Sequence, residues 1–181
     1  EKGYFDRSKL KKYAKNNSIF EEHPSSKING VVCSTGSLGH GLSFGAGISI
    51  GENFLKKKNK TIVLLSDGEC NEGSVWEAAG FASAQKLNNL IAIIDSNKWQ
   101  ATGRSKNIFG GDLKRKWESF GWKSISVDGH NLNSINRILK KIKTKQTKPT
   151  AIIANTIKGK GIYFMEDDNN WHYRIPTKNE L

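Results

Sequence analysis

Cysteine, acidic residues and long apolar runs are all scarce in this chain of 181 residues. The two cysteines, Cys33 and Cys70, are isolated, which argues against a disulfide framework or a metal-binding cysteine pair. Such sparse cysteine usage is typical of a reducing compartment, so we expect a cytoplasmic location. No apolar run approaches the roughly 20 residues that cross a bilayer, and the polar opening residues lack the apolar segment of a secretory signal. We therefore expect no membrane role.

The shortage of acidic residues leaves the chain strongly basic. Lys and Arg number 29 against 17 Asp and Glu, a formal net charge of +12 at pH 7. A basic chain can bind nucleic acid, but most of the excess is lysine scattered through expected helices and loops. Examples are Lys56, Lys57, Lys58, Lys140, Lys141, Lys143 and Lys145. Because zinc-finger, basic-zipper and aromatic RNA-reading motifs are absent, we expect no nucleic-acid partner, and the charge can instead attract a small anionic ligand.

Length and composition predict one globular domain. Hydrophobic residues make up 36% and charged residues 25% of the chain, as in ordinary globular proteins. The sequence opens without Met, and residues 176–181 read as a helix cap followed by an interrupted helix. We expect a single domain over residues 1–181 that is truncated at both ends.

Short apolar runs alternate with helical patterns along the chain. Continuous apolar runs at 61–65, 90–94 and 151–154, with a weaker one at 124–127, predict buried parallel strands. Helices are expected at 38–57, 74–86, 111–120 and 132–143. This alternation predicts an α/β fold with a mostly parallel sheet flanked by helices.

Polar residues follow two successive predicted strands. Asp67 comes after the first strand and Asn97 after the next, and parallel strands place their carboxyl ends on one edge of the sheet. Carboxylate and amide oxygens suit Mg²⁺ or Ca²⁺, and the backbone carbonyl of Trp99 is a plausible third ligand. Gly68 would let an anionic ligand approach the backbone, beside the positive end of a helix starting near Ser74. The alternative is an ordinary Asp-Gly turn and a loop asparagine.

Several motifs in order resemble one family. They are LSDGECNEGSVWEAA at 65–79 followed by Asp95-Ser96-Asn97, STGSLGHGLS at 34–43, EKGYF at 1–5, His23-Pro24, NTIKGKG at 155–161, and Trp171-His172. Together they resemble the N-terminal, diphosphate-binding half of the transketolase family, whose domain has a thiamine diphosphate-binding fold. Either such a half or the N-terminal subunit of a split transketolase fits the resemblance.

The resemblance implies roles for individual residues. The implied Mg²⁺ ligands are Asp67, Asn97 and the carbonyl of Trp99. The implied cofactor-binding residues are Gly36, Leu38, Gly68, Glu69, Asn97, Lys158 and His172. The implied catalytic residues are His172, His23 at the substrate entrance, and Glu72, which with Glu77 would belong to a glutamate network across a dimer.

Other interpretations of these residues remain open. His23 can cap a loop, Glu77 can be a solvated helix residue, and Lys158 can belong to a plain basic turn. His40 is expected to pack or to cap beside the glycine-rich turn, and the five tryptophans to be packing or interface residues. Asp167 and Asp168 are expected to form a solvated acidic turn. The family's first motif glycine is Ser66 here, which would be strained if that position needed a positive φ. Gln100-Ala101-Thr102-Gly103 also departs from the family's usual acidic position, and the family's histidine-bearing segment before the opening motif is missing.

The implied activity is transfer of a two-carbon ketol unit between sugar phosphates, with thiamine diphosphate and Mg²⁺ as cofactors. In the family, the glutamate that activates the cofactor lies in a separate pyrimidine-binding domain. We therefore expect a C-terminal partner subunit or domain and a homo- or hetero-oligomer. The alternatives are a component of another thiamine diphosphate-dependent synthase, or a cofactor-binding remnant without turnover.

Overall fold

A four-stranded parallel sheet forms the centre of the protein. The computed structural model describes residues 2–142 and 147–180, so the predictions that touch Glu1, Lys143, Lys145 and Leu181 lie outside the described residues. The strands are β1 (Thr61–Ser66), β2 (Leu90–Ser96), β5 (Lys123–Asp128) and β6 (Thr150–Asn155), in the order β1-β2-β6-β5. All three neighbouring pairs are parallel, which confirms the predicted fold class.

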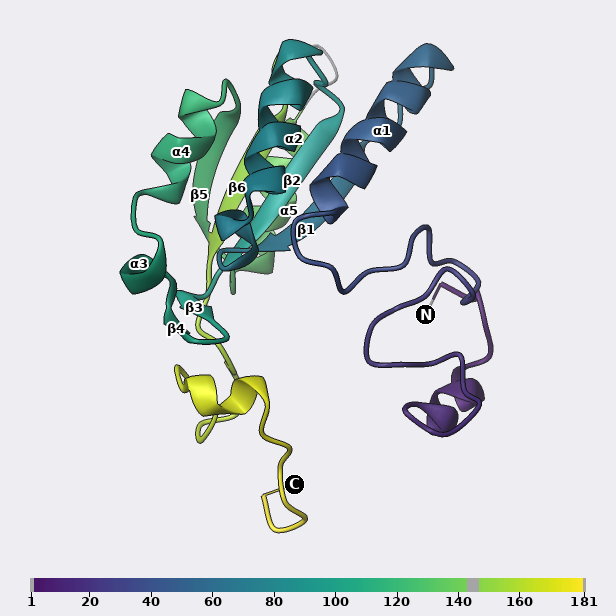
Figure 1. Ribbon diagram of the computed structural model, residues 1–181. Helices are drawn as coiled ribbons and strands as arrows, with labels where there is room; N and C mark the ends of the chain where they lie inside the picture. The colour runs from purple at the N-terminus through teal and green to yellow at the C-terminus, as the bar shows by residue number, and fades with distance from the viewer. Residues whose placement is uncertain (1, 143–146, 181) are drawn as a thin grey trace.

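Helices cover the two faces of the sheet unequally. Helices α1 (Gly41–Phe54), α2 (Gly73–Ala84) and α4 (Leu113–Ser119) lie on one face, while α5 (Leu132–Lys141) covers the other (Figure 1). Asp112 and Asn131 cap α4 and α5 with their side chains, because each accepts a backbone N–H of the first turn.

Two of the predicted helices end earlier than expected, for one shared reason. The left-handed backbone of Lys56 (φ 54°) and Lys86 (φ 52°) terminates α1 and α2 before the predicted residues 57 and 86. At the other end of α1, Gly39 takes φ 82°, so residues 38–40 form a turn and the helix begins at Gly41.

The main core lies between the sheet and the three-helix face. Leu65, Val75, Leu90 and Ile94 are buried there, and Trp117 is fully buried against Trp122 with ring centroids 4.7 Å apart. Trp122 donates its indole N–H to the carbonyl of Ala79, which satisfies its polar atom in the core.

Several short elements correspond to none of the predicted strands and helices. They are the hairpin of β3 (Trp99–Gln100) and β4 (Gly103–Arg104), helix α3 (Ser105–Ile108), and the 3₁₀ helices η1 (Arg7–Lys12), η2 (Glu69–Asn71) and η3 (Asn169–His172). None is long enough to produce a hydrophobic period, so pattern analysis has no signal for them.

Two mostly irregular segments extend from the carboxyl edge of the sheet. Residues 2–40 lie to one side, and residues 156–180 continue from the end of β6 (Figure 1). In the part of the chain that the structure describes, no helix combines the length and apolar character needed to span a membrane. The ends of β1, β2 and β6 thus lie between two long connections, which is where the candidate site forms.

The contact of α1 with the sheet gives a test of the packing. An added Cβ at Gly45 would lie 2.3 Å from Cγ2 of Val63, whereas one at Gly47 would meet nothing within 4 Å. Gly45→Ala should therefore destabilise the fold by about 1–3 kcal/mol through overpacking. The matched Gly47→Ala change should stabilise it by roughly 0.5–1 kcal/mol through helix propensity. Urea unfolding of both variants measures this, and equal effects would refute the packing of α1 on β1.

Candidate active site

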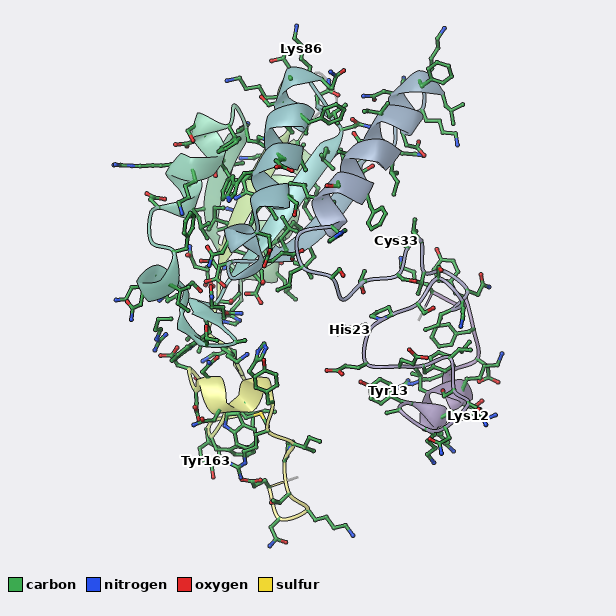
Figure 2. The ribbon with its side chains drawn as sticks, viewed as in Figure 1. Lys12, Tyr13, His23, Cys33, Lys86 and Tyr163 are labelled. Carbon is green, nitrogen blue, oxygen red and sulfur yellow. The ribbon has the colours of Figure 1, made fainter. Side chains whose placement is uncertain are left out.

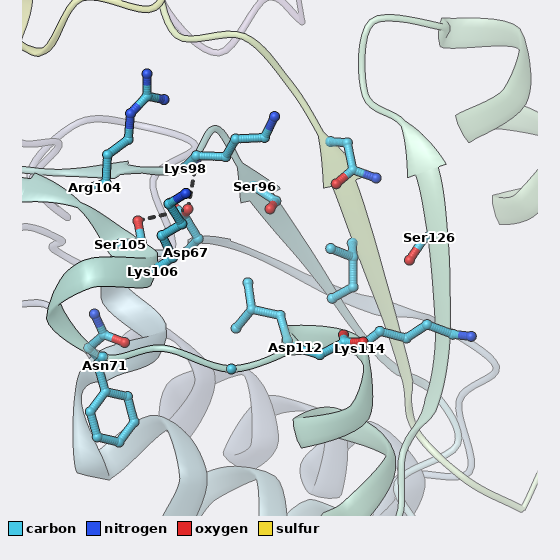
Figure 3. A pocket seen from close by; sticks show the side chains of 15 residues that line it. Asp67, Asn71, Ser96, Lys98, Arg104, Ser105, Lys106, Asp112, Lys114 and Ser126 are labelled. Carbon is cyan, nitrogen blue, oxygen red and sulfur yellow. Dashed lines mark hydrogen bonds between the residues drawn. The ribbon is translucent and has the colours of Figure 1, made fainter.

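The carboxylate of Asp67 lies buried immediately after β1. Its side chain is only 4% exposed. One oxygen accepts hydrogen bonds from the Lys98 backbone N–H (2.8 Å) and the Ser105 hydroxyl (2.9 Å), and the other from the Gly68 N–H (3.0 Å) (Figure 3). Donors from three places in the chain therefore fix this carboxylate.

Burial shifts the acidity of this group. Desolvation is the largest effect and raises the pKa of Asp67 above its ordinary value, while the bonds from Ser105, Lys98 and Gly68 act in the opposite direction. The nearby charge of Asp95 adds to the upward shift of the pKa. A carboxylate whose charged form is disfavoured in this way is a favourable neighbour for a cation.

Asn97 lies beside Asp67, on the adjacent strand end. Ser66 pairs with Asp95 in the register of β1 and β2, and the backbone N–H of Asp67 donates to the carbonyl of Asp95 (3.1 Å). The carboxamide of Asn97 donates through Nδ2 to Asp95 (3.4 Å) and accepts through Oδ1 from the Trp99 N–H (2.9 Å). The parallel register thus brings the two predicted ligands to one edge, as the sequence predicted.

The carbonyl of Trp99 joins the same edge. An added Cβ on Gly68 would lie 3.7 Å from the Trp99 carbonyl oxygen and 2.7 Å from Cβ of Gln100. The space beside Gly68 is therefore filled by the hairpin, which is a second reason for glycine here besides the expected approach of an anion. Among residues 2–142 and 147–180, no group of three or more His, Cys, Asp or Glu side chains has metal-binding geometry. The candidate set instead combines one carboxylate, one carboxamide and one carbonyl oxygen, which fits a hard divalent cation.

Ser66 fits its position without strain. It ends β1 and is not among the residues with positive φ, so strain is not a consequence of replacing the family's glycine. Its hydroxyl accepts the backbone N–H of Glu69 (2.9 Å). The serine therefore stabilises the turn that carries Asp67.

Glu69 anchors the loop of residues 34–40. One of its carboxylate oxygens accepts the Gly39 N–H (3.0 Å), and the Ser74 hydroxyl donates to the Gly39 carbonyl (3.0 Å). The positive φ of Gly39, and its close approach to Glu72 and Ser74, leave no room for a Cβ. Glu69 therefore has a structural contact in this site that the sequence alone did not reveal.

His23 and Gly36 line a shallow groove of about 530 Å³ together with Leu38 and Glu69. Gly36 has φ 120°, and an added Cβ there would lie 2.8 Å from the His23 ring. His40 precedes α1 and is exposed, and its ring Nδ1 lies 3.1 Å from the Leu38 carbonyl oxygen, a contact beside the glycine-rich turn rather than packing in the core. Four of the predicted site residues therefore share one surface.

Glu72 and Glu77 are both exposed on α2. Glu72 occupies the N-terminal cap position, but its side chain makes no capping hydrogen bond there. The exposed position of Glu77 matches the interpretation of a solvated helix residue, and both carboxylates are accessible to another chain.

The C-terminal segment carries Lys158 and His172. Lys158 is half-buried and its carbonyl accepts the Asp167 N–H (2.9 Å), while the exposed His172 ring lies edge-on to Tyr173. Within the described residues, no hydrogen bond joins either side chain to Asp67 or Asn97. Figure 2 shows His23 and Tyr163 on two separate segments, so the structure does not bring His23 and this segment together.

Asp167 lies in a solvent-exposed turn as predicted, with its side chain 51% exposed, but it also makes a contact that the sequence did not predict. Its carboxylate accepts two hydrogen bonds from Arg104 (2.7 and 2.6 Å) and one from the Trp99 indole (2.8 Å). The Arg104 guanidinium also lies 3.8 Å from the centre of the Trp99 ring. Asp167 is distant from both partners in sequence, which is why local sequence patterns missed this contact. It fastens the C-terminal segment to the hairpin.

A cationic pocket lies next to Asp67. It has a volume of about 440 Å³, and its lining includes Lys98, Arg104, Lys106 and Lys114 (Figure 3). Ser96 and Asn155 also line it, from the ends of β2 and β6. Part of the chain's positive charge is therefore concentrated at the carboxyl edge of the sheet, where an anionic ligand would gain from it.

Loss of the Glu69 anchor should release the loop of residues 34–40. In Glu69→Ala the Gly39 N–H loses its acceptor, so we expect hydrogen exchange at the Gly39 amide to accelerate at least about tenfold. Glu72→Ala, which removes an exposed carboxylate close to the same glycine, is the matched control and should leave this rate unchanged. Equal exchange in both variants would exclude the anchor.

The contact of Asp167 should titrate at low pH. Hydrogen bonds from Arg104 and then Trp99 lower the pKa of Asp167 from 3.8 to about 2. Because the folded value is the lower one, the contact contributes its full stabilisation above about pH 4 and loses it as the pH falls towards 2. The Trp99 indole proton should follow this titration in NMR spectra. The Trp171 indole donates to the Phe164 carbonyl and should not, and a Trp99 midpoint near 3.8 would contradict the contact.

Comparison with known proteins identifies the family. The family described as "Transketolase, thiamine diphosphate binding domain" matches residues 2–177. The chain is 37% identical to one subunit of the apulose-4-phosphate transketolase of Phocaeicola vulgatus, over 97% of this chain and 63% of that protein. It is 41% identical to the corresponding subunit from Actinobacillus succinogenes, over 100% of this chain and 66% of the relative. The chain therefore spans less than two thirds of the length of these relatives.

Solved structures agree with this result. The transketolase of Campylobacter jejuni superposes with a TM-score of 0.85 at 30% identity, over 90% of this chain and 27% of that one. By sequence, human transketolase is 39% identical to this chain, over 99% of this chain and 29% of its own length. From the family match, the identities and the shared fold, the chain belongs to the transketolase family, as part of its thiamine diphosphate-binding domain.

Proposed function

We propose that this chain supplies the diphosphate-binding part of a thiamine diphosphate- and Mg²⁺-dependent transketolase. The observation that carries the proposal is the buried Asp67 carboxylate beside Asn97 and the Trp99 carbonyl, at the ends of two paired strands. Asp67, Asn97 and the Trp99 carbonyl would hold Mg²⁺, or Ca²⁺ in its place. Phosphate oxygens and water would complete the coordination of the ion, because Mg²⁺ takes few protein ligands.

The remaining residues divide into binding and reacting groups. The Gly68 backbone and Lys158 would contact the diphosphate, and the lysine-lined pocket would favour the approach of anions. Gly36, Leu38 and Glu69 would form the wall along the organic part of the cofactor, with His23 at the substrate entrance. When bound, thiamine diphosphate supplies the carbon nucleophile that a ketol transfer needs.

His23 would act on the sugar, and His172 would contact both the cofactor and the sugar. An imidazole ring has one nitrogen that can accept a proton and one that can donate it, so either ring would serve proton transfer at a sugar hydroxyl. Both rings are exposed, His23 on the segment before α1 and His172 on the segment after β6. For both to contact one substrate, the two segments would have to approach each other around it.

A partner chain completes the proposed enzyme. The two relatives from Phocaeicola vulgatus and Actinobacillus succinogenes are each named as a single lettered subunit of a transketolase, which is the name of one part of an assembly. By the same reasoning, this chain would assemble with a subunit or domain that carries the pyrimidine-binding part, in a homo- or hetero-oligomer. The exposed Glu72 and Glu77 would then face that partner, where close carboxylates share protons.

Cofactor binding tests this proposal directly. Calorimetry of the chain with thiamine diphosphate should show heat of binding that requires Mg²⁺. Asp67→Ala should weaken the affinity more than about tenfold because it removes a metal ligand. Glu118→Ala removes a carboxylate from the surface of α4 and should bind like the original chain. Binding that persists in Asp67→Ala, or that ignores Mg²⁺, would refute the proposed site.

Activity separates an enzyme part from a cofactor-binding remnant. Mixed with a chain that carries the pyrimidine-binding part, this chain should support ketol transfer that neither chain supports alone. Cofactor binding without any transfer in the mixture would favour the remnant.

A further inference from the structure

A carboxamide can hold a cation only through its oxygen. Asn97 presents Oδ1 on one side of its amide plane and Nδ2 on the other, and Nδ2 is a donor that repels a metal ion. Any role of Asn97 as a ligand therefore depends on which way its amide is turned. The neighbours of the amide decide this.

Two contacts set the orientation of the Asn97 amide. Nδ2 donates to Oδ2 of Asp95 at 3.4 Å, and Oδ1 accepts the Trp99 N–H at 2.9 Å. A reversed amide would put its oxygen against the carboxylate of Asp95 and its NH₂ against the Trp99 N–H, so both contacts would become repulsive. The bond to Asp95 is long, but it sets an acceptor oxygen on the NH₂ side of the amide.

Asp95 is itself held in place by β6 and β1. Its other carboxylate oxygen accepts the hydroxyl of Thr156, directly after β6. Asp95 pairs with Ser66 on one side and Ala154 on the other, and its carbonyl accepts the Asp67 N–H (3.1 Å). With both carboxylate oxygens engaged, Asp95 stands between the strands that carry Asp67 and Thr156.

We propose that Asp95, fastened by Thr156, is a positioning residue that turns the Asn97 carboxamide oxygen towards the divalent cation. This inference rests on the proposed function, because it concerns the same cation site. It assigns no direct contact with the ion to Asp95. Ordering a ligand through a second residue typically changes metal affinity by about 10–100-fold.

Two substitutions separate orientation from charge. Asp95→Ala removes the acceptor for Nδ2, so that only the bond from the Trp99 N–H to Oδ1 still restrains the amide. Asp95→Asn keeps an acceptor oxygen for Asn97, while the introduced NH₂ group can donate to the Thr156 hydroxyl. If orientation is what matters, Asp95→Asn should rescue the site, and if the negative charge is what matters, it should fail like alanine.

The first measurement uses the ligand-free chain. In ¹⁵N NMR spectra the side-chain NH₂ of Asn97 should exchange slowly in the original chain and in Asp95→Asn, and at least about fivefold faster in Asp95→Ala. Thermal unfolding of each variant confirms that it is folded. Equal exchange in all three folded chains would overturn the positioning role, whatever the cofactor does.

The second measurement is calorimetry with Mg²⁺ and thiamine diphosphate. Asp95→Ala should lose about tenfold or more in affinity, and Asp95→Asn should stay within about threefold of the original chain. Unchanged affinity in Asp95→Ala, or an equal loss in both variants, would overturn the inference. If the original chain binds no cofactor but shows the predicted amide exchange, the proposed function fails while the hydrogen bond from Asn97 to Asp95 stands.

Discussion

A carboxylate kept out of water at the end of β1 is the constraint on which this site depends. Burial of Asp67 disfavours its charged form, and three hydrogen-bond donors offset only part of that effect on its pKa. The parallel pairing of β1 with β2 then brings Asn97 beside it, and the hairpin adds the Trp99 carbonyl. Together these oxygens form a site in which a divalent cation would offset the free-energy cost of burying the Asp67 carboxylate.

Three anchors hold the irregular segments around this edge. Glu69 fixes the loop of residues 34–40, Thr156 engages Asp95, and Asp167 fastens the C-terminal segment to Arg104 and Trp99. Each anchor is a side chain that joins residues far apart in sequence. The sheet supplies the rigid frame, and the anchors place on it the loops that would bind an organic cofactor and its substrate.

Local and long-range features of this molecule differ in how far the sequence predicts them. The strands were found within about two residues of their ends, because buried parallel strands are continuous apolar runs. The proximity of Asp67 and Asn97 followed from the parallel topology alone. By contrast, the hydrogen bond from the Trp99 indole to Asp167 joins residues far apart in sequence, so local patterns give no signal for it. The same holds for the bond from the Gly39 N–H to Glu69, which are about thirty residues apart. Strain at Ser66 was tied to a positive φ at that position, which this chain does not adopt.

Anomalous diffraction from the chain crystallised with Mn²⁺ and thiamine diphosphate is the most direct test of this account. Mn²⁺ takes oxygen ligands as Mg²⁺ does and can be located by its own signal. A single strong peak within bonding distance of a carboxylate oxygen of Asp67, Oδ1 of Asn97 and the Trp99 carbonyl is the predicted result. A bound cofactor whose metal peak lies away from Asp67 would contradict the central claim.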